Sequence, residues 1–157
     1  MKNLSDDICN ILYWNVWSIQ NEKKLDNLLQ IIEDLDIQIA CICETWFDSL
    51  EGTFTKRIEE EGFLIAHAFR EEKKGGGAAI IYKKSLKVKP GEVSSSKYIS
   101  FEFSTVILKY SQAKILLMCI YRKQEQSFKN FREEFESFLD GVGNKAEMLI
   151  IVGDFNV

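Results

Sequence analysis

The stretch of sequence that decides the fold is MLIIVGDFNV, residues 148–157. Its first five residues are all apolar, which predicts a strand covered on both faces, and Gly153 allows the backbone a tight turn. Asp154 and Asn156 then stand at the end of a rigid strand. In layered α/β proteins ligands bind at the carboxyl ends of strands, because the core fixes the position while the loop stays accessible. These two residues are therefore the first candidates for a functional site.

Three earlier apolar runs also end in a polar residue. They are 11–14 followed by Asn15, 39–43 followed by Glu44, and 115–120 followed by Tyr121. Taken singly, such residues are more often turn, capping or packing residues. Two carboxylates, two carboxamides and a phenol on one rim would be costly unless they held a cation, and hard oxygen ligands suit Mg²⁺ or Mn²⁺ rather than zinc. We expect the carboxylates of Glu44 and Asp154 within about 8 Å of each other.

The motifs follow one another in a recognisable order. They are Asn15, Glu44-Thr45, three glycines at 75–77 before a strand at 78–82, Tyr121-Arg122, and Gly-Asp-Phe-Asn at 153–156. This order resembles the endonuclease/exonuclease/phosphatase superfamily, and within it the apurinic-type endonuclease domain of non-LTR (LINE-like) retrotransposons. The resemblance implies an α/β (α+β) fold, the N-terminal part of a four-layer sandwich with two mixed β-sheets flanked by helices. It covers nearly all of 1–157, which we expect to form a single incomplete domain lacking the family's C-terminal Ser-Asp-His segment.

The resemblance also implies roles for individual residues in Mg²⁺- or Mn²⁺-dependent hydrolysis of a DNA phosphodiester. Glu44 would be the principal metal ligand, with Asn15 beside it holding the metal or the groups around it. Asp154 would orient or deprotonate the attacking water. Asn156 and Tyr121 would donate hydrogen bonds to the phosphate. Since the family's histidine and the aspartate that orients it belong to the missing segment, we expect the chain alone to be inactive.

Two other functions remain open. Other branches of the superfamily act on phosphoinositides, sphingomyelin or RNA tails, although the triple-glycine strand and Tyr121-Arg122 favour the retroelement branch. The chain is alternatively a non-catalytic remnant or interaction module. Trp17 stands where the retrotransposon pattern often has Arg, and Lys123-Gln124 replaces the usual prolines. We expect the apolar strand at 148–152 to leave an open edge, and hence self-association or a partner that completes the sandwich.

Composition and charge limit the cellular setting. The chain is 46% hydrophobic and 28% charged, which is typical of one globular domain, and no apolar stretch is long enough to span a membrane. Its four cysteines lie in apolar runs, which indicates core packing and a reducing, intracellular compartment, nuclear if the protein acts as a retroelement endonuclease. The net charge of −4 is weak support for DNA binding. Basic residues do gather locally, at 73–74, 83–84, 87–89 and 122–123, and are either a positive rim or a solvated face.

Apolar periodicity predicts the remaining elements. One helical stripe predicts a helix at 22–34, and a phenylalanine-rich stripe from Phe128 predicts a second, with Ser127 as N-cap and Gly141 as its stop. Strands are expected at 63–69, 78–82, 86–88, 98–109 and 114–121. The glycines at 75–77 indicate a hairpin or bulge with positive φ rather than a nucleotide-binding loop, since no Lys-Ser or Lys-Thr pair follows. His67, the only histidine, is expected to be a satisfied or surface residue.

Overall fold

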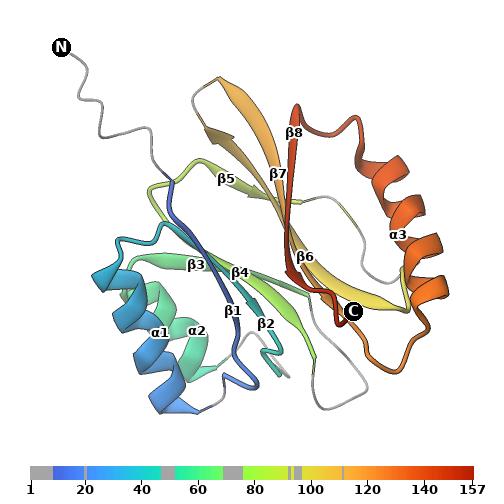
Figure 1. Ribbon diagram of the computed structural model, residues 1–157. Helices are drawn as coiled ribbons and strands as arrows, with labels where there is room; N and C mark the ends of the chain where they lie inside the picture. Colours follow the sequence, from blue (N-terminus) through green and yellow to red (C-terminus); the bar gives the residue numbers. More distant parts are fainter. Residues whose placement is uncertain are drawn as a thin grey trace.

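The computed structural model of the protein describes residues 9–19, 21–46, 52–68, 76–91, 93, 97–110 and 112–157. Two four-stranded sheets pack face to face, with two helices outside one sheet and a third helix outside the other (Figure 1). This arrangement confirms the predicted four-layer sandwich of two mixed sheets flanked by helices. None of the helices in the described residues is long and apolar enough to cross a membrane.

The first sheet has the strand order β1-β2-β4-β3. Its strands are β1 (Ile11–Asn15), β2 (Ile39–Cys43), β3 (Phe63–Ala68) and β4 (Ala78–Lys83). β1 and β2 are parallel because α1 (Glu22–Asp34) connects them, and the other two pairs are antiparallel. The Asn21 side chain caps α1 by accepting a hydrogen bond of 2.9 Å from the backbone N–H of Lys23. The buried side of α1 carries Leu25, Leu28 and Ile32.

The second sheet has the order β5-β6-β7-β8. Its strands are β5 (Val88–Pro90), β6 (Phe101–Tyr110), β7 (Ala113–Arg122) and β8 (Met148–Asp154). Helix α3 (Phe128–Val142) joins β7 to the parallel strand β8 and covers the outer face of this sheet (Figure 1). Its Phe131 and Phe138 are buried against Phe101 and Phe103 of β6. The phenylalanine stripe is therefore a core stripe, as its helical spacing predicts.

The core between the two sheets is aliphatic and contains three of the four cysteines. Cys41, Cys43 and Cys119 are fully buried there, and the thiols are free, as the sequence predicts. Cys9 is half-buried and precedes β1 rather than lying within it. A continuous core on both sides of each sheet fixes where the strand ends lie. The candidate residues expected from the sequence stand at those ends.

Several boundaries differ from the predictions made from sequence. The sequence does not predict α2 (Thr53–Glu60), a helix of eight residues whose N-cap Gly52 makes no side-chain capping bond and whose one buried residue is Ile58. Helix α3 continues past Gly141 to Val142, which is buried, and Gly143 is its C-cap. Phe128 was expected in the buried stripe but is 55% exposed. Short or weakly patterned segments of this kind carry too few apolar positions to define their ends.

The strands differ from expectation at their ends as well. β5 begins at Val88, β6 begins at Phe101, and β7 gains one residue at each end. Residue 69, expected at the end of β3, and Gly75 both lie outside the described residues. Gly76 and Gly77 have φ of 79° and 92°, so the prediction of positive φ before β4 is confirmed for these two.

The decisive strand β8 lies at an edge of its sheet, and β1 lies at an edge of the other. Met148 is 49% exposed and Leu149 is 38% exposed, so the prediction that this run is covered on both faces is wrong for these residues. Gly153 does not turn the chain either, because it continues β8 and pairs with Ile120 of β7. A Cβ at this position would collide with the Ile120 carbonyl oxygen, which is why the strand needs glycine here.

Candidate functional site

Asn15 joins the two sheets at the rim formed by their strand ends. Its Nδ2 donates hydrogen bonds to Glu44 Oε1 at 3.2 Å and to Asp154 Oδ2 at 2.8 Å. Asn15 ends β1, Glu44 follows β2, and Asp154 ends β8 on the opposite sheet. Two oxygens bound to one nitrogen must lie well within the expected separation of about 8 Å. The structure therefore brings together three residues that are up to 139 positions apart in sequence.

The loop after β2 presents Glu44 in a constrained backbone conformation. Glu44 has φ of 56°, which side chains other than glycine adopt infrequently. Its backbone N–H donates to the Gly77 carbonyl at 2.8 Å, and its carbonyl accepts from Ser18 N–H at 2.7 Å. At Gly77 an added Cβ would meet the Thr45 hydroxyl. The glycines before β4 thus allow the close approach that holds Glu44 at the rim.

Asp154 and Asn156 form a turn at the end of β8. Asp154 Oδ1 accepts a hydrogen bond of 3.0 Å from the backbone N–H of Asn156, which has φ of 46°. The Asn156 carboxamide donates from Nδ2 to the Arg122 carbonyl at 2.7 Å and accepts at Oδ1 from Gln124 at 2.9 Å. A carboxamide carries two N–H donors, so one remains for a ligand. Asn156 is placed beside Asp154, but it also has a structural role.

Arg122 holds this turn from inside the protein. It is 7% exposed and its guanidinium donates to the carbonyl oxygens of Asn156 and Gln126. The same guanidinium lies over the rings of Phe128 and Phe131, at 5.7 and 5.8 Å from their centroids. Its five donors in a fixed plane suit two carbonyl acceptors. Arg122 therefore positions the Asp154–Asn156 turn and does not belong to an exposed basic rim.

Tyr121 lies in strand register with Asp154 on one side and with Glu102 on the other. Burial of the phenol, together with the negative charges of Glu44 and Asp154, raises its pKa to about 12. The hydroxyl is therefore protonated at neutral pH and can donate a hydrogen bond. Sequence reasoning missed Tyr13, whose pKa is raised by burial and by nearby groups that include Asp154. Strand alternation offered the signal, because Tyr13 and Asn15 lie on the same face of β1.

His67 lies near the rim but brings no charge to it. Its Nε2 is 3.2 Å from the hydroxyl of Thr45, the residue after Glu44, and Thr45 is fully buried. Burial lowers the pKa of His67 to about 4, so the ring is neutral at pH 7. The contact of Nε2 with Thr45 is a polar partner of the kind expected for a satisfied or surface histidine.

The donor set at the rim fits a hard divalent cation. Carboxylate oxygens are the ligands that Mg²⁺ and Mn²⁺ prefer, and Mg²⁺ usually takes one or two carboxylates and completes its shell with water and substrate. In the part of the chain that the structure describes, no three His, Cys, Asp or Glu side chains cluster as a ready metal cage. Asn15 Oδ1 accepts from the Trp17 backbone N–H at 3.2 Å. As placed, Asn15 holds the two carboxylates together through its amide N–H, and its oxygen keeps a second lone pair.

The basic residues noted in the sequence are largely engaged elsewhere. Lys83 forms an ion pair of 2.7 Å with Asp36, and Lys84 donates to the Glu59 carbonyl. Lys123 lies 3.5 Å from Glu102. Residues 73–74 lie outside the described part of the chain. These contacts favour a solvated, paired set of lysines over one continuous positive rim.

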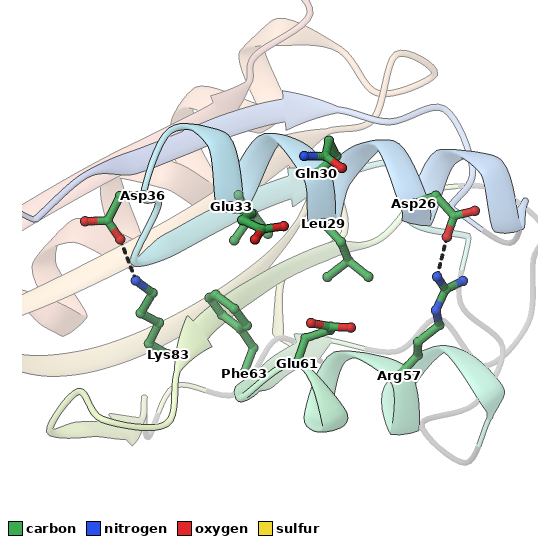
Figure 2. A pocket seen from close by; sticks show the side chains of 10 residues that line it. Asp26, Leu29, Gln30, Glu33, Asp36, Arg57, Glu61, Phe63 and Lys83 are labelled. Carbon is green, nitrogen blue, oxygen red and sulfur yellow. Dashed lines mark hydrogen bonds and ion pairs between the residues drawn. The ribbon is translucent and has the colours of Figure 1, made fainter.

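A separate groove lies on the outer side of the first sheet. It runs between α1 on one wall and α2 with the end of β4 on the other, and is closed at its two ends by the ion pairs Asp26–Arg57 and Asp36–Lys83 (Figure 2). Leu29 and Phe63 form part of its lining. The exposed acids Glu33 and Glu61 also line the groove, and they are carboxylates away from the rim with which metal binding at Glu44 and Asp154 can be compared.

Solved structures share this fold. The endonuclease domain of TRAS1, a telomere-specific non-LTR retrotransposon, matches with a TM-score of 0.69 and 17% identity over 96% of this chain and 60% of that one. An AP endonuclease from Archaeoglobus fulgidus matches with 0.67 and 17% over 96% and 58%. D. rerio TDP2 complexed with a single strand DNA product matches with 0.69 and 15% over 95% and 61%. The chain thus spans about three fifths of the length of these structures, and identities this low show the fold alone.

The sequence comparisons give the family. No curated protein matches the chain significantly. Residues 12–157 match the model of the Endonuclease/Exonuclease/phosphatase family, and the matched segment contains all the rim residues described above. The chain therefore belongs to the endonuclease/exonuclease/phosphatase family.

Proposed function

We propose that the rim is the site of a Mg²⁺- or Mn²⁺-dependent hydrolase that cleaves a DNA phosphodiester, as an endonuclease of the retrotransposon type does. The observation that carries the proposal is the Asn15 amide, which binds carboxylates from both sheets at 3.2 and 2.8 Å. Two carboxylates held this close repel each other unless positive charge lies nearby. Held in place by an amide and by strand ends, Glu44 and Asp154 form a preorganised site for a cation and its water.

Glu44 is the proposed metal ligand and Asn15 the residue that fixes its direction. A bound divalent cation would supply positive charge to a phosphate oxygen and to the leaving oxygen. Asp154 is proposed to accept a proton from the attacking water or to orient it. Its Oδ1 is occupied by the Asn156 backbone N–H and its Oδ2 by Asn15, and each oxygen keeps a second lone pair for a water molecule.

Tyr121 and Asn156 are proposed to bind the phosphate. The raised pKa of Tyr121 keeps its hydroxyl protonated at neutral pH, so that it can donate to an oxygen on which negative charge develops. The second amide N–H of Asn156 supplies another donor, and the bonds to Arg122 and Gln124 hold it in position. Donors fixed before the reaction stabilise the transition state without a reorganisation cost.

DNA is the proposed substrate on two grounds. The fold is shared with the TRAS1 endonuclease domain and with a TDP2 complexed with a single strand DNA product. The glycines before β4 and Tyr121-Arg122 resemble the retroelement branch. If the protein acts in that setting, we propose a nuclear location.

We propose that the 157 residues alone turn over slowly or not at all. The only histidine is His67, whose neutral ring lies 3.2 Å from the Thr45 hydroxyl. A missing proton-handling group costs on the order of 10²–10⁴-fold in rate. The family's Ser-Asp-His segment, if supplied with these residues as one domain, would complete the site.

Calorimetry and plasmid nicking test the proposal. Mg²⁺ or Mn²⁺ should bind weakly to the wild-type chain, Glu44→Gln should abolish binding, and Glu33→Gln in the α1–α2 groove should leave it unchanged. Supercoiled plasmid should remain essentially uncut. Unchanged metal binding in Glu44→Gln would remove Glu44 from its role. Robust nicking that survives Asp154→Asn would remove Asp154 from its role.

A second candidate function is an interaction module, favoured by the edge strand β8. Its exposed Met148 and Leu149 and its unpaired edge suit addition of a strand from a partner or from another copy of the chain. Sedimentation over a range of concentrations should show species larger than a monomer. A monomer at all concentrations that binds no hydrophobic dye would count against this function.

A further inference from the structure

Trp17 is a large aromatic side chain exposed beside the carboxylate rim. Its exposed fraction is 67%, whereas Val16 and Ile19 in the same loop are only 2% and 1% exposed. A single flat ring therefore projects into solvent from a loop that is otherwise packed into the protein. The exposed ring adds nothing to the core and is accessible to a ligand.

The loop that carries Trp17 is held by hydrogen bonds on every side. The Trp17 N–H donates to Asn15 Oδ1, and the ammonium group of Lys24 donates to the carbonyls of both Val16 and Trp17. Ser18 N–H donates to the Glu44 carbonyl at 2.7 Å. The backbone under the indole is thus tied to α1 and to the loop of the proposed metal ligand, and a ligand that meets the ring does not have to order it first.

The backbone at Trp17 is also in an unfavourable conformation. Its φ is 43° and that of Ser18 is 68°, both in the left-handed region, which is a genuine outlier for a bulky side chain. Strain of this kind persists where the surrounding contacts impose it, and it clusters at binding and catalytic sites. At Trp17 those contacts come from Asn15 and Lys24, and the result is an outward-facing indole.

A hydrogen bond links the backbone of Trp17 to Asn15 of the rim. The carboxamide that receives the Trp17 N–H is the one that binds Glu44 and Asp154. The residue that carries the exposed indole is therefore bound directly to the carboxamide that holds the two carboxylates. We propose that Trp17 is a stacking platform for a nucleobase next to the scissile phosphate, and that the substrate is DNA with an unpaired or easily unstacked base at that position.

This proposal rests on the proposed function and deepens it. Stacking on an aromatic side chain is tolerant of sequence, since every base has a π-face, and it needs no positive charge. It suits a chain of net charge −4, because an acidic chain makes few favourable phosphate contacts. A membrane surface fits less well, because in the described part of this loop, residues 16–19, Val16 and Ile19 are buried beside one exposed ring.

The test is binding of a fluorescein-labelled single-stranded DNA of 10 nucleotides to the full chain in Ca²⁺, followed by anisotropy. Trp17→Ala should weaken binding by about 5- to 150-fold, the range for loss of one base–aromatic stack. Trp17→Phe should retain most of the affinity, and Trp17→Leu, which is apolar but cannot stack, should behave like alanine. Leu35→Ala, an equally exposed apolar residue at the far end of α1, is the matched control and should change nothing.

Salt dependence separates stacking from charge. The slope of log affinity against log salt should be the same in wild type and Trp17→Ala, because an uncharged contact releases no counterions. Trp17→Arg should steepen it by about 0.7, the value for one phosphate contact on a single strand. Circular dichroism melts of each variant verify that the fold is intact.

Three results would overturn the proposal. They are wild-type affinity in Trp17→Ala, no binding of the oligonucleotide by the wild type, and Trp17-dependent binding to phosphatidylcholine vesicles that contain a phosphoinositide. Calorimetry of Mn²⁺ binding to wild type and Glu44→Gln distinguishes failure of the Trp17 proposal from failure of the proposed function. Metal binding that still depends on Glu44 leaves the proposed function standing when the Trp17 proposal fails, and loss of that dependence removes both.

Discussion

Replacing Asn15 by alanine removes the contact that joins the two sheets at the rim. The wild-type side chain makes three hydrogen bonds, to Glu44, to Asp154 and from the Trp17 backbone, at 3.2, 2.8 and 3.2 Å. Two of them involve carboxylates. The variant leaves two negative charges close together with no donor between them, and frees the loop that carries Trp17.

The expected loss of unfolding free energy in Asn15→Ala follows from these three hydrogen bonds. A hydrogen bond to a buried charged group contributes about 1.5–3 kcal/mol and a neutral one about 1 kcal/mol, but this site is half-exposed, where solvent screening reduces each of the three bonds to about 1 kcal/mol or less. We therefore expect Asn15→Ala to lose about 2–3 kcal/mol of unfolding free energy in EDTA. For a protein of this size each kcal/mol shifts the melting temperature by about 2–4 °C, which gives a fall of roughly 4–12 °C.

Differential scanning calorimetry in EDTA and in Mg²⁺ measures the effect. Asn10→Ala is the matched control, since Asn10 lies just before β1, at the opposite end from Asn15, and its side chain donates to the neutral carbonyls of Leu35 and Asp36 in an exposed position. We expect it to lose less than about 1 kcal/mol. Saturating Mg²⁺ should reduce the loss of unfolding free energy in Asn15→Ala but not in Asn10→Ala, because a cation can replace the donor between the carboxylates. Equal melting of the two variants in EDTA would refute the reasoning.

The remaining predictions concern stability and protonation. Gly153→Ala should cost at least about 1–3 kcal/mol in urea unfolding, because its Cβ collides with the backbone of β7, whereas Gly141→Ala, whose Cβ meets no atom within 4 Å, should stabilise α3 by about 0.5–1 kcal/mol. The ring of His67 should stay neutral down to about pH 4 in NMR titrations. Only the unfolded chain takes up that proton between about pH 6.5 and 4, so stability should fall as pH is lowered through this window, and His67→Gln should lack the step. Glu134→Gln should lose about 1 kcal/mol at pH 7, since the carboxylate accepts three hydrogen bonds from residues 99 and 100. These bonds lower the pKa of the carboxyl, so denaturant titrations at decreasing pH should show the difference shrinking as the folded carboxyl takes up a proton.

Local sequence signals were enough to predict the polar residues that stand at the strand ends of the rim. Asn15 and Glu44 each follow an apolar run, and parallel pairing of β1 with β2 brings their ends level. Helix α1 was predicted with its observed ends, because its apolar stripe acts within one element. The residues of the proposed site are all of this kind.

Contacts between distant segments could not be predicted. In the sequence Arg122 is one of several basic residues. Its role depends on the carbonyl oxygen of Asn156, 34 positions away, which accepts its hydrogen bond. The two bonds from Lys24 that hold the Trp17 loop require α1 to pack beside that loop. The exposure of Met148 and Leu149 in β8 is likewise a property of the sheet and not of the apolar run, since the run alone predicts a strand covered on both faces.

Localising a bound divalent cation tests directly whether the strand ends that carry Asn15, Glu44 and Asp154 form a metal site. Mn²⁺ added at substoichiometric amounts broadens the NMR signals of nuclei near the site where it binds. The account predicts that the backbone amides of Asn15, Glu44 and Asp154 broaden first, that the amides of Glu33 and Glu61 in the α1–α2 groove do not, and that the effect vanishes in Glu44→Gln. Broadening centred on the groove, or an unchanged pattern in Glu44→Gln, would show that the strand ends do not form the metal site.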